Sequence, residues 1–395
     1  MMMMETLTDV LLVTANVGSL FDNLGQIQNS WLLEFYTTVD THKPRFIALH
    51  FQEVGGKDYK TNMTHAENFF WTIESSMEMS DFDRVCIYID SDFETEDNFT
   101  ALGSIYFIHK SLENVQQYDF SAKEFRLVSG RNKYADSLYG VTTVEKEKFQ
   151  RNFWPDRKWS RKGYMRTRWL IHNQGLDLVN VHLFHDASNL VACKCSPSVY
   201  STYRQKALRY VISRISNDFG PLPFFLFGDF NFRLDTLRLV QDLSTTAEVQ
   251  MVMDSTNEVE KIIYKEKGND HKVLFQIETK QFLYLHHKLF REDTGQKLLE
   301  YDSETAAFDD IITEEEIRFL PSYPYSEDYS KPTQYMNTRC PAWCDRILMS
   351  HNTRDVIYRR NDGQNNVVYN ILGQKVCMGD HKPVFLFFAL KSNNQ

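Results

Sequence analysis

Polar residues suited to hydrolytic chemistry follow a short apolar run near the middle of the chain. The run Phe224–Phe227 predicts a buried strand, and Gly228, Asp229 and Asn231 come directly after it. Because side chains alternate along a strand, Asp229 and Asn231 leave the chain on the same side. A carboxylate that can accept a proton from water, next to an amide that can stabilise an oxyanion, is suited to phosphoryl chemistry. Taken alone, this stretch is equally well explained as a turn that caps a strand, because Gly, Asp and Asn all favour turns.

Further polar residues stand at the ends of other apolar strands. They are Asn16, Glu53, His182, Asp345 with Arg346, and Asp380 with His381. Singly, each has a structural explanation as a lone histidine, an ion pair or a turn. Together they can meet at one rim of a twisted two-sheet sandwich. There Glu53 offers an oxygen ligand to a hard divalent cation, and Asn16 and Asp380 could supply others. No group of His and Cys residues has the spacing of a zinc site, so the sequence offers no zinc site as an alternative.

The elements that must position these residues alternate between strands and helices. The predicted strands are Thr8–Asn16, Phe46–Leu49, 84–89, 102–108, Leu176–Phe184 and Val384–Leu390. The predicted helices follow Asn29 or Ser30 as N-cap, cover 62–80, and run over Pro197–Asp218 with Ser196 as N-cap. Residues 236–318 are charged in a mostly helical pattern, so we expect helices that cover a sheet, with an insertion as the open alternative.

Composition bounds the class of protein. No linker divides the 395 residues, so we expect one domain over 1–395, with 1–7 and 391–395 outside its core. The formal net charge of −9 argues against a general binder of nucleic acid or anionic membranes. Six cysteines without metal-finger spacing predict reduced thiols in the cytosol. No signal peptide or run long enough to cross a membrane is visible, and we expect a cytoplasmic monomer.

One stretch departs from the acidic average. Gln150–Arg168 interleaves tryptophan with the basic residues Arg151, Arg157, Lys158, Arg161, Lys162, Arg166 and Arg168. Such a stretch suits stacking on single-stranded nucleic acid, and a solvated loop without a partner is a second interpretation. In an acidic protein we prefer a small, very anionic ligand, because a local pocket can be positive where the whole is not.

In this order the residues resemble the DNase-I-like endonuclease/exonuclease/phosphatase superfamily. Gly228–Arg233 and Pro341–Arg346, which reads Pro-Ala-Trp-Cys-Asp-Arg, are similar to the two signature motifs of the inositol polyphosphate 5-phosphatases. Nucleases of the superfamily lack the second motif in this form. The resemblance runs from Leu11 to Phe388, and the type I enzymes are singled out by Leu12–Phe21, Val179–Leu190 and Tyr335–Pro341.

The resemblance implies an α+β fold, the DNase-I-like four-layer α/β sandwich, in which two mixed β-sheets pack face to face with helices outside. It implies Mg2+-dependent removal of the 5-phosphate of soluble inositol 1,4,5-trisphosphate and inositol 1,3,4,5-tetrakisphosphate, which terminates calcium-release signalling. It implies no nucleic-acid partner. Relatives that cleave phosphoinositide lipids carry basic residues before the second motif. Here Tyr335–Arg339 holds only Arg339, in agreement with a soluble substrate.

The resemblance also suggests a mechanism, which is a hypothesis. Water attacks phosphorus in line, Asp229 orients and deprotonates it, and Glu53 is the main ligand of the magnesium ion. We expect His381, oriented by Asp345, and His182 to donate hydrogen bonds to the phosphate oxygens. Asn231 and Asn16 are expected to be neutral hydrogen-bond donors, and Arg346 is expected to bring positive charge to the site. For the other phosphates and for substrate binding generally we expect Arg161, Lys162, Arg166, Arg168 and Lys382.

The chain departs from the family pattern in two places. Arg161-Lys162-Gly163 stands where the family usually has Asn-Lys-Gly, which places any role of that asparagine in doubt. Type I enzymes of animals end in a prenylated cysteine box, but this chain ends Lys391–Gln395 without cysteine. Peripheral membrane attachment is therefore expected only of a longer form with a lipidated C-terminus. A nuclease and an inactive inositol-phosphate-binding module remain as alternatives, which plasmid nicking and phosphate release would separate.

Overall fold

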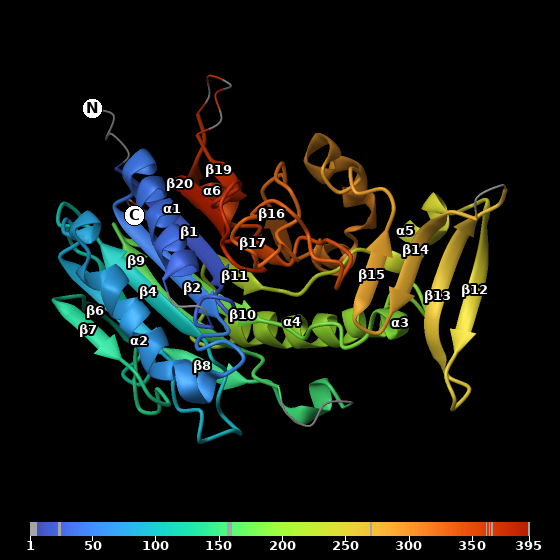
Figure 1. Ribbon diagram of the computed structural model, residues 1–395. Coiled ribbons are helices and arrows are strands. Elements are labelled where there is room, and N and C mark those ends of the chain that lie inside the picture. Colours follow the sequence, from blue (N-terminus) through green and yellow to red (C-terminus); the bar gives the residue numbers. More distant parts are fainter. Residues whose placement is uncertain are drawn as a thin grey trace.

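The computed structural model describes residues 6–22, 25–155, 160–268, 271–360, 362, 364 and 366–393. Within these residues two eight-stranded sheets pack face to face, and helices cover both outer faces (Figure 1). Apolar side chains such as Leu12 and Phe227 fill the space between the sheets. The predicted α+β sandwich of four layers is confirmed. No helix of the described residues is long and apolar enough to cross a membrane.

The first sheet is mixed, because β1 pairs in parallel with β2 and antiparallel with β20. β1 and β2 run nearly without interruption through buried residues, as expected for strands covered on both faces. Leu7 pairs with Lys391, so the sheet includes one residue from each of the terminal segments, 1–7 and 391–395, that we expected outside the core. In spatial order the strands are β18 (Ile357–Tyr358), β20 (Val384–Lys391), β1 (Leu7–Asn16), β2 (Phe46–Gln52), β4 (Gly103–Ile108), β3 (Arg84–Ile89) and β7 (Arg131–Tyr134), with β19 (Val368–Ile371) also paired to β20.

The second sheet is built around the phenylalanine-rich strand β11, which pairs in parallel with β10 and antiparallel with β17. In spatial order its strands are β16 (Ile312–Glu314), β17 (Asp345–Ser350), β11 (Phe224–Asp229), β10 (Gln174–His182), β9 (Gly163–Ile171), β5 (Gln116–Asp119) and β6 (Glu124–Leu127), with β8 (Glu145–Lys148) also paired to β9.

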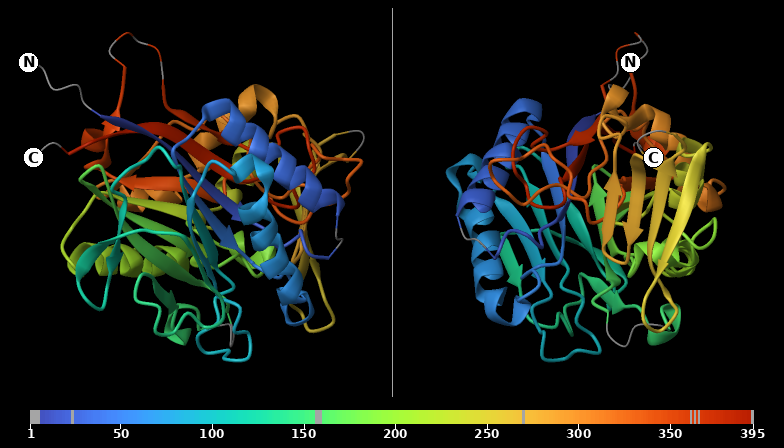
Figure 2. Two further views of the ribbon diagram at one scale, coloured as in Figure 1. Left: turned by 90° about the vertical axis from the view of Figure 1, so that its left-hand side faces the viewer. Right: turned by 45° about the vertical axis from the view of Figure 1, so that its right-hand side comes forward.

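Helices shield the outer face of each sheet. α1 and α2 pack on the first sheet, and α4 packs on the second, on the opposite side of the molecule (Figure 2). The predicted N-caps were wrong by a few residues: α1 begins after Gly25, and Ser198 caps α4 by accepting a hydrogen bond from the backbone N–H of Tyr200. The helices are α1 (Gln26–His42), α2 (Tyr59–Ser75), α3 (Asn189–Ala192), α4 (Val199–Asn217), α5 (Thr236–Leu243) and α6 (Thr353–Val356).

Residues 236–318 are not mostly helical, which corrects the sequence-based expectation. After α5 the chain forms a separate antiparallel sheet at one end of the molecule (Figure 1). The outermost strand β12 is largely exposed, so no buried run marks it as a strand in the sequence. The strands are β12 (Ala247–Met253), β13 (Val259–Glu266), β14 (Val273–Glu278) and β15 (Gln281–Tyr284), and the 3-10 segments Glu292–Tyr301 and Glu304–Phe308 follow.

Strand register places the polar strand ends in two rows. In the second sheet His182 lies opposite Asp229, and Asp229 lies opposite Asp345 on its other side. In the first sheet Asn16 lies opposite Gln52, directly before Glu53. Residues that are opposite in register have neighbouring side chains on one face of the sheet.

Gly228 allows the close approach of β10 and β11, the strands that carry His182 and Asp229. A Cβ added at Gly228 would lie 1.9 Å from Val181 O on the neighbouring strand, a distance that no side chain can occupy. Alanine at this position must therefore force β10 and β11 apart.

We predict that Gly228→Ala lowers the free energy of unfolding by about 3 kcal/mol or more, because overpacking here is against backbone. Gly175→Ala is the matched control in β10, since its Cβ would meet only the mobile end of Leu222 at 3.0 Å. Urea denaturation of both variants measures the difference. Equal stability of the two would contradict this role of Gly228.

Candidate active site

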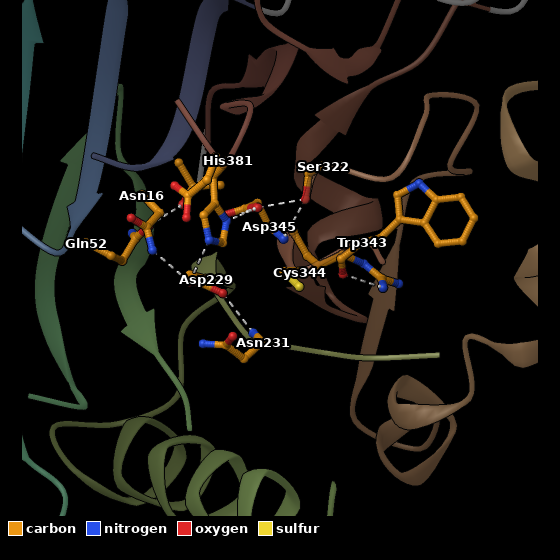
Figure 3. Close-up of polar contacts among 12 residues, drawn as sticks. Asn16, Gln52, Asp229, Asn231, Ser322, Trp343, Cys344, Asp345 and His381 are labelled. Carbon is orange, nitrogen blue, oxygen red and sulfur yellow. Dashed lines mark hydrogen bonds and ion pairs between the residues drawn. The ribbon is translucent and has the colours of Figure 1, made fainter. Parts of the chain in front are cut away.

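Asp229 lies at the centre of the polar residues that the two sheets bring together (Figure 3). It is buried, and its Oδ2 accepts a hydrogen bond from Asn16 Nδ2 at 3.0 Å, across the seam between the sheets. The nearest imidazole nitrogens are His182 Nε2 at 3.3 Å and His381 Nε2 at 3.9 Å. Burial alone would raise the pKa of Asp229, but the charge of His381 and the contact with His182 hold it well below its usual range. The carboxylate is therefore always ionised.

His381 is held by a second carboxylate. Its Nδ1 contacts Asp345 Oδ2 at 2.8 Å, which turns Nε2 toward Asp229 (Figure 3). Burial alone would lower the pKa of His381, but the carboxylates of Asp345 and Asp229 raise it to about 10. The ring is therefore a cation at neutral pH, and Nε2–H is available as a charged hydrogen-bond donor.

Ser322 completes this arrangement and was not predicted from the sequence. Its hydroxyl donates to Asp345 Oδ2 at 2.7 Å and accepts from the backbone N–H of Asp345 at 3.2 Å. Burial raises the pKa of Asp345 to about 6, although His381 lies beside it. Ser322 thus fixes the carboxylate that orients the imidazole. Its one signal in the sequence is its place in the rigid loop Pro321–Tyr325.

Glu53 and Asn16 offer the donor set for a divalent cation. A Cβ added at Gly18 would lie 2.6 Å from Glu53 Oε2 and 3.2 Å from Asn16 Oδ1, so the missing side chain leaves a space between two oxygens. Burial would raise the pKa of Glu53, but the charge of Lys162, with those of Arg161 and His381, lowers it to about 2, and the carboxylate stays ionised. Glu53 has a positive φ of 54°, a sparsely populated conformation typical of functional sites. These oxygens fit a hard cation.

A second cluster could hold a cation by distance alone. Ligand atoms of Asp229, Asp345 and His381 lie within 4.8 Å of one another. However, Nδ1 of His381 is engaged with Asp345 at 2.8 Å. Asp345 and His381 therefore form a hydrogen-bonded relay, whose Nε2 lies 3.9 Å from Asp229, and Glu53 remains the preferred ligand. The third predicted ligand, Asp380, accepts a hydrogen bond from the hydroxyl of Ser19 at 2.9 Å, and burial raises its pKa.

Lys162 and His182 supply positive charge and a hydrogen-bond donor beside Glu53. Lys162 Nζ lies 2.5 Å from His182 Nε2 and 3.7 Å from Glu53 Oε1. Burial and the neighbouring lysine lower the pKa of His182, so its ring is neutral. Its Nε2 can accept from Lys162 or donate to Asp229, but one tautomer cannot do both.

Asn231 is anchored, and Arg161 faces the cleft. Asn231 Nδ2 donates to Leu183 O at 2.9 Å, which leaves one of its two hydrogens for a ligand. Its backbone N–H donates to Asp229 Oδ1 at 2.9 Å. Arg161 donates to Gly56 O and lines a cleft together with Glu53 and Lys162. Arg157 and Lys158 lie outside the described residues.

Four predicted substrate-binding side chains do not reach the site, which corrects the sequence analysis. Arg346 follows Asp345 in β17, so its side chain leaves on the opposite face, where it pairs with Glu314 and Asp302. Arg166 and Arg168 alternate with core residues of β9 and pair with the buried Asp177. Lys382 donates to the carbonyls of Gly373 and Val376 at 2.6 and 2.7 Å. Each has a structural role.

Two polar bridges join the sheets beneath the site. Gln52 Nε2 donates to Asn180 Oδ1 at 2.8 Å, and Asn180 Nδ2 donates to Phe51 O and Gly103 O. His50 contacts Phe227 O and the hydroxyl of Tyr106, and burial lowers its pKa to about 3. No site role was predicted for Gln52, Asn180 or His50. The available signal was their polarity within otherwise apolar strands.

Comparison with known proteins agrees with this geometry. Residues 25–387 match the model of the endonuclease/exonuclease/phosphatase family 2. Human inositol polyphosphate-5-phosphatase A is 52% identical over 385 residues, covering 97% of this chain and 93% of the relative. The chain belongs to the inositol polyphosphate 5-phosphatases. These enzymes are phosphoric monoester hydrolases, and a probable type I inositol 1,4,5-trisphosphate 5-phosphatase of Caenorhabditis elegans is 34% identical, covering 96% of this chain and 99% of that protein.

Solved structures confirm the 5-phosphatase fold. The inositol polyphosphate 5-phosphatase domain of spSynaptojanin, solved with inositol (1,4)-bisphosphate and a calcium ion, matches with a TM-score of 0.50 at 13% identity, covering 98% of this chain and 85% of that domain. A Cimex nitrophorin matches with a TM-score of 0.51, also at 13% identity, covering 98% of this chain and 99% of that protein. Because a nitrophorin shares it, the fold alone does not decide the chemistry.

We predict that Asp345→Asn lowers the pKa of His381 by about 2 units, because an adjacent carboxylate stabilises the imidazolium. In the wild type the ring stays protonated up to about pH 10. The stability gained from its raised pKa is complete below about pH 6.5 and is lost as the pH rises toward 10. NMR titration of the histidine Cε1 protons measures the change, with His381→Gln to assign the signal. An unchanged midpoint would contradict the relay.

Proposed function

We propose that this 5-phosphatase removes the 5-phosphate of inositol 1,4,5-trisphosphate and inositol 1,3,4,5-tetrakisphosphate with the help of Mg2+, and so terminates calcium-release signalling. The observation that carries the proposal is the ionised Asp229 between a neutral and a cationic imidazole, next to the oxygens of Glu53 and Asn16. The name of the Caenorhabditis elegans relative supports the trisphosphate as substrate. Inositol 1,4-bisphosphate, seen in the spSynaptojanin structure, is what remains when that substrate loses its 5-phosphate.

Asp229 acts on the attacking water. Its free lone pairs accept a hydrogen bond from the water and aim it at phosphorus for an in-line displacement without a covalent intermediate. Because its pKa is held low, Asp229 orients the water in the ground state. It receives the proton only when the forming P–O bond makes the water acidic.

Cationic donors stabilise the charge that the phosphate develops. His381 donates its Nε2–H to a non-bridging oxygen, and its charge is secured by Asp345. Lys162 adds a second positive charge on the side of Glu53. Preorganised donors of this kind stabilise the transition state more than the ground state. A divalent cation held by Glu53 and Asn16 would neutralise phosphate charge and assist the leaving inositol oxygen.

We predict that Glu53→Gln reduces the turnover number for inositol 1,4,5-trisphosphate at least about 100-fold, because the cation loses its anionic ligand. Phosphate release, measured with and without a chelator, should cease in the chelator and return with added Mg2+. Glu248→Gln is the control, because Glu248 is an exposed residue of β12. Undiminished release in the chelator would contradict the requirement for a cation. Absence of release by the wild type would contradict the substrate.

Arg161 is our candidate for the 1- or 4-phosphate, because it lines the cleft that leads to Glu53 and Lys162. We predict that Arg161→Ala raises KM about tenfold with little change in kcat, as expected for binding that is equal in ground and transition state. Arg168→Ala should instead destabilise the fold, because it leaves part of the charge of buried Asp177 unpaired. Steady-state kinetics and thermal unfolding of both variants test the distinction. A fall in kcat for Arg161→Ala would place this residue in the chemistry.

A further inference from the structure

Two amide side chains, Gln52 and Asn180, lie behind the residues of the site, and the proposed reaction gives them no role. Both are fully buried. Gln52 ends β2 immediately before Glu53 (Figure 3). Asn180 lies two residues before His182 in β10, so these two side chains leave the strand on the same face. The amide pair therefore connects the strand that precedes the cation ligand to the strand that carries an imidazole of the site.

Asn180 uses its whole side chain to hold the first sheet. Its Oδ1 accepts a hydrogen bond from Gln52 Nε2 at 2.8 Å. Its Nδ2 donates to Phe51 O at 3.1 Å and to Gly103 O at 2.9 Å, so both amide hydrogens are used. One side chain of the second sheet thus fixes the side chain of Gln52 and the carbonyl groups of two neighbouring strands, β2 and β4, of the first.

The backbone on both sides of the Gln52 side chain is fixed as well. Phe51 O is held by Asn180, and Gln52 O accepts a hydrogen bond from the N–H of Val17 at 3.0 Å. Glu53 follows this fixed backbone with its positive φ of 54°. The position of the Glu53 carboxylate relative to the second sheet therefore depends on the bonds that Asn180 makes.

The proposed chemistry needs a constant separation of the two sheets. Glu53 follows a strand of the first sheet, whereas His182 and Asp229 belong to the second. A reacting phosphate must contact groups of both sheets, and a misplacement of about 1 Å can lower a rate about 100-fold. Buried and fully paired amides resist such a misplacement, because a change in the separation would leave buried polar groups unpaired.

We propose that Gln52 and Asn180 are positioning residues, and that the hydrogen bond between them sets the separation between Glu53 and the residues of the second sheet that act on the phosphate. The kinetic consequence rests on the proposed function. Both amides act through Glu53 and the second sheet, and neither contacts the substrate, because both are buried.

A second amide bridge between the sheets provides a matched control. Gln117 of β5 is buried, and its Nε2 donates to the hydroxyl of Tyr88 in β3 at 2.8 Å. β5 is two strands away from β10 in the second sheet, and β3 is two strands away from β2 in the first. This bridge also joins the sheets through a buried glutamine, but it does not adjoin a residue of the site.

The kinetic test compares Gln52→Met with Gln117→Met, because each removes one buried amide and keeps the volume of the side chain nearly constant. Gln52→Met should lower kcat for inositol 1,4,5-trisphosphate at least about tenfold and raise the Mg2+ concentration for half-maximal activity at least about fivefold. Gln117→Met should leave both values within about twofold of the wild type. Assays are run below the thermal unfolding of both variants. Equal losses in the two variants would show a general effect on the fold and overturn the proposal.

Gln52→Asn covers the case in which Gln52→Met does not fold. It keeps the amide but shortens the side chain by one methylene group, so it cannot hold the same separation. Its kcat and its dependence on Mg2+ should change in the same direction as those of Gln52→Met. Wild-type values in Gln52→Asn would overturn the proposal.

A second readout does not depend on activity. Electron paramagnetic resonance measures how far inorganic phosphate tightens the binding of Mn2+, which reports the coupling between the cation and the phosphate donors of the second sheet. Gln52→Met should reduce this tightening at least about fivefold, whereas Gln117→Met should keep it. If the wild type released no phosphate from inositol 1,4,5-trisphosphate, the proposed function would fail while this readout still tested the bridge. Equal tightening in Gln52→Met and the wild type, or none in the wild type, would overturn the positioning role itself.

Discussion

The structure depends on one buried carboxylate that both sheets share. Asp229 accepts a hydrogen bond from Asn16 of the first sheet and lies beside His182 of the second. A buried anion costs several kcal/mol unless opposite charge and hydrogen bonds compensate it. Here the compensation comes from His381 and Lys162, which are also the groups that we propose to bind the phosphate. In this proposal the same side chains stabilise Asp229 and bind the substrate.

The fold serves this interaction by bringing strand ends into register. His182, Asp229 and Asp345 are successive neighbours across three strands, so no flexible loop has to place them. Gly228 allows β10 and β11 to approach each other. The hydrogen bond between Gln52 and Asn180 joins the first sheet to the second. His381 comes from the loop before β20, where a hydrogen bond to Asp345 fixes its ring, and Ser322 in turn holds the Asp345 carboxylate.

Much of this arrangement is predictable from the sequence. Apolar runs located about half of the strands of the two large sheets, and polar residues at the ends of such runs singled out Asp229, Glu53 and His182. The two motifs of the second sheet added Asn231 and Asp345. The strands were predicted correctly because a strand buried on both faces has a strong local signal. The structure brings these polar residues together, and their functional roles stay predictions.

Several other predictions failed for physical reasons. Arg346, Arg166 and Arg168 were assigned to the substrate by their charge, but alternation along the strand sends them to the other face. The sheet of 247–284 was missed because its outermost strand, β12, is exposed and no buried run marks it as a strand. The contact of Ser322 with Asp345 joins residues 23 apart, and no local pattern encodes it.

Diffraction at the manganese absorption edge would show which of the two clusters of oxygen and nitrogen atoms holds the cation. Crystals grown with Mn2+ and inositol 1,4-bisphosphate should show an anomalous peak bonded to Glu53, with His381 still hydrogen-bonded to Asp345. A peak between Asp229, Asp345 and His381, with none at Glu53, would mean that the imidazole is a metal ligand. The account of Asp229 as an anion balanced by a protonated His381 would then be wrong.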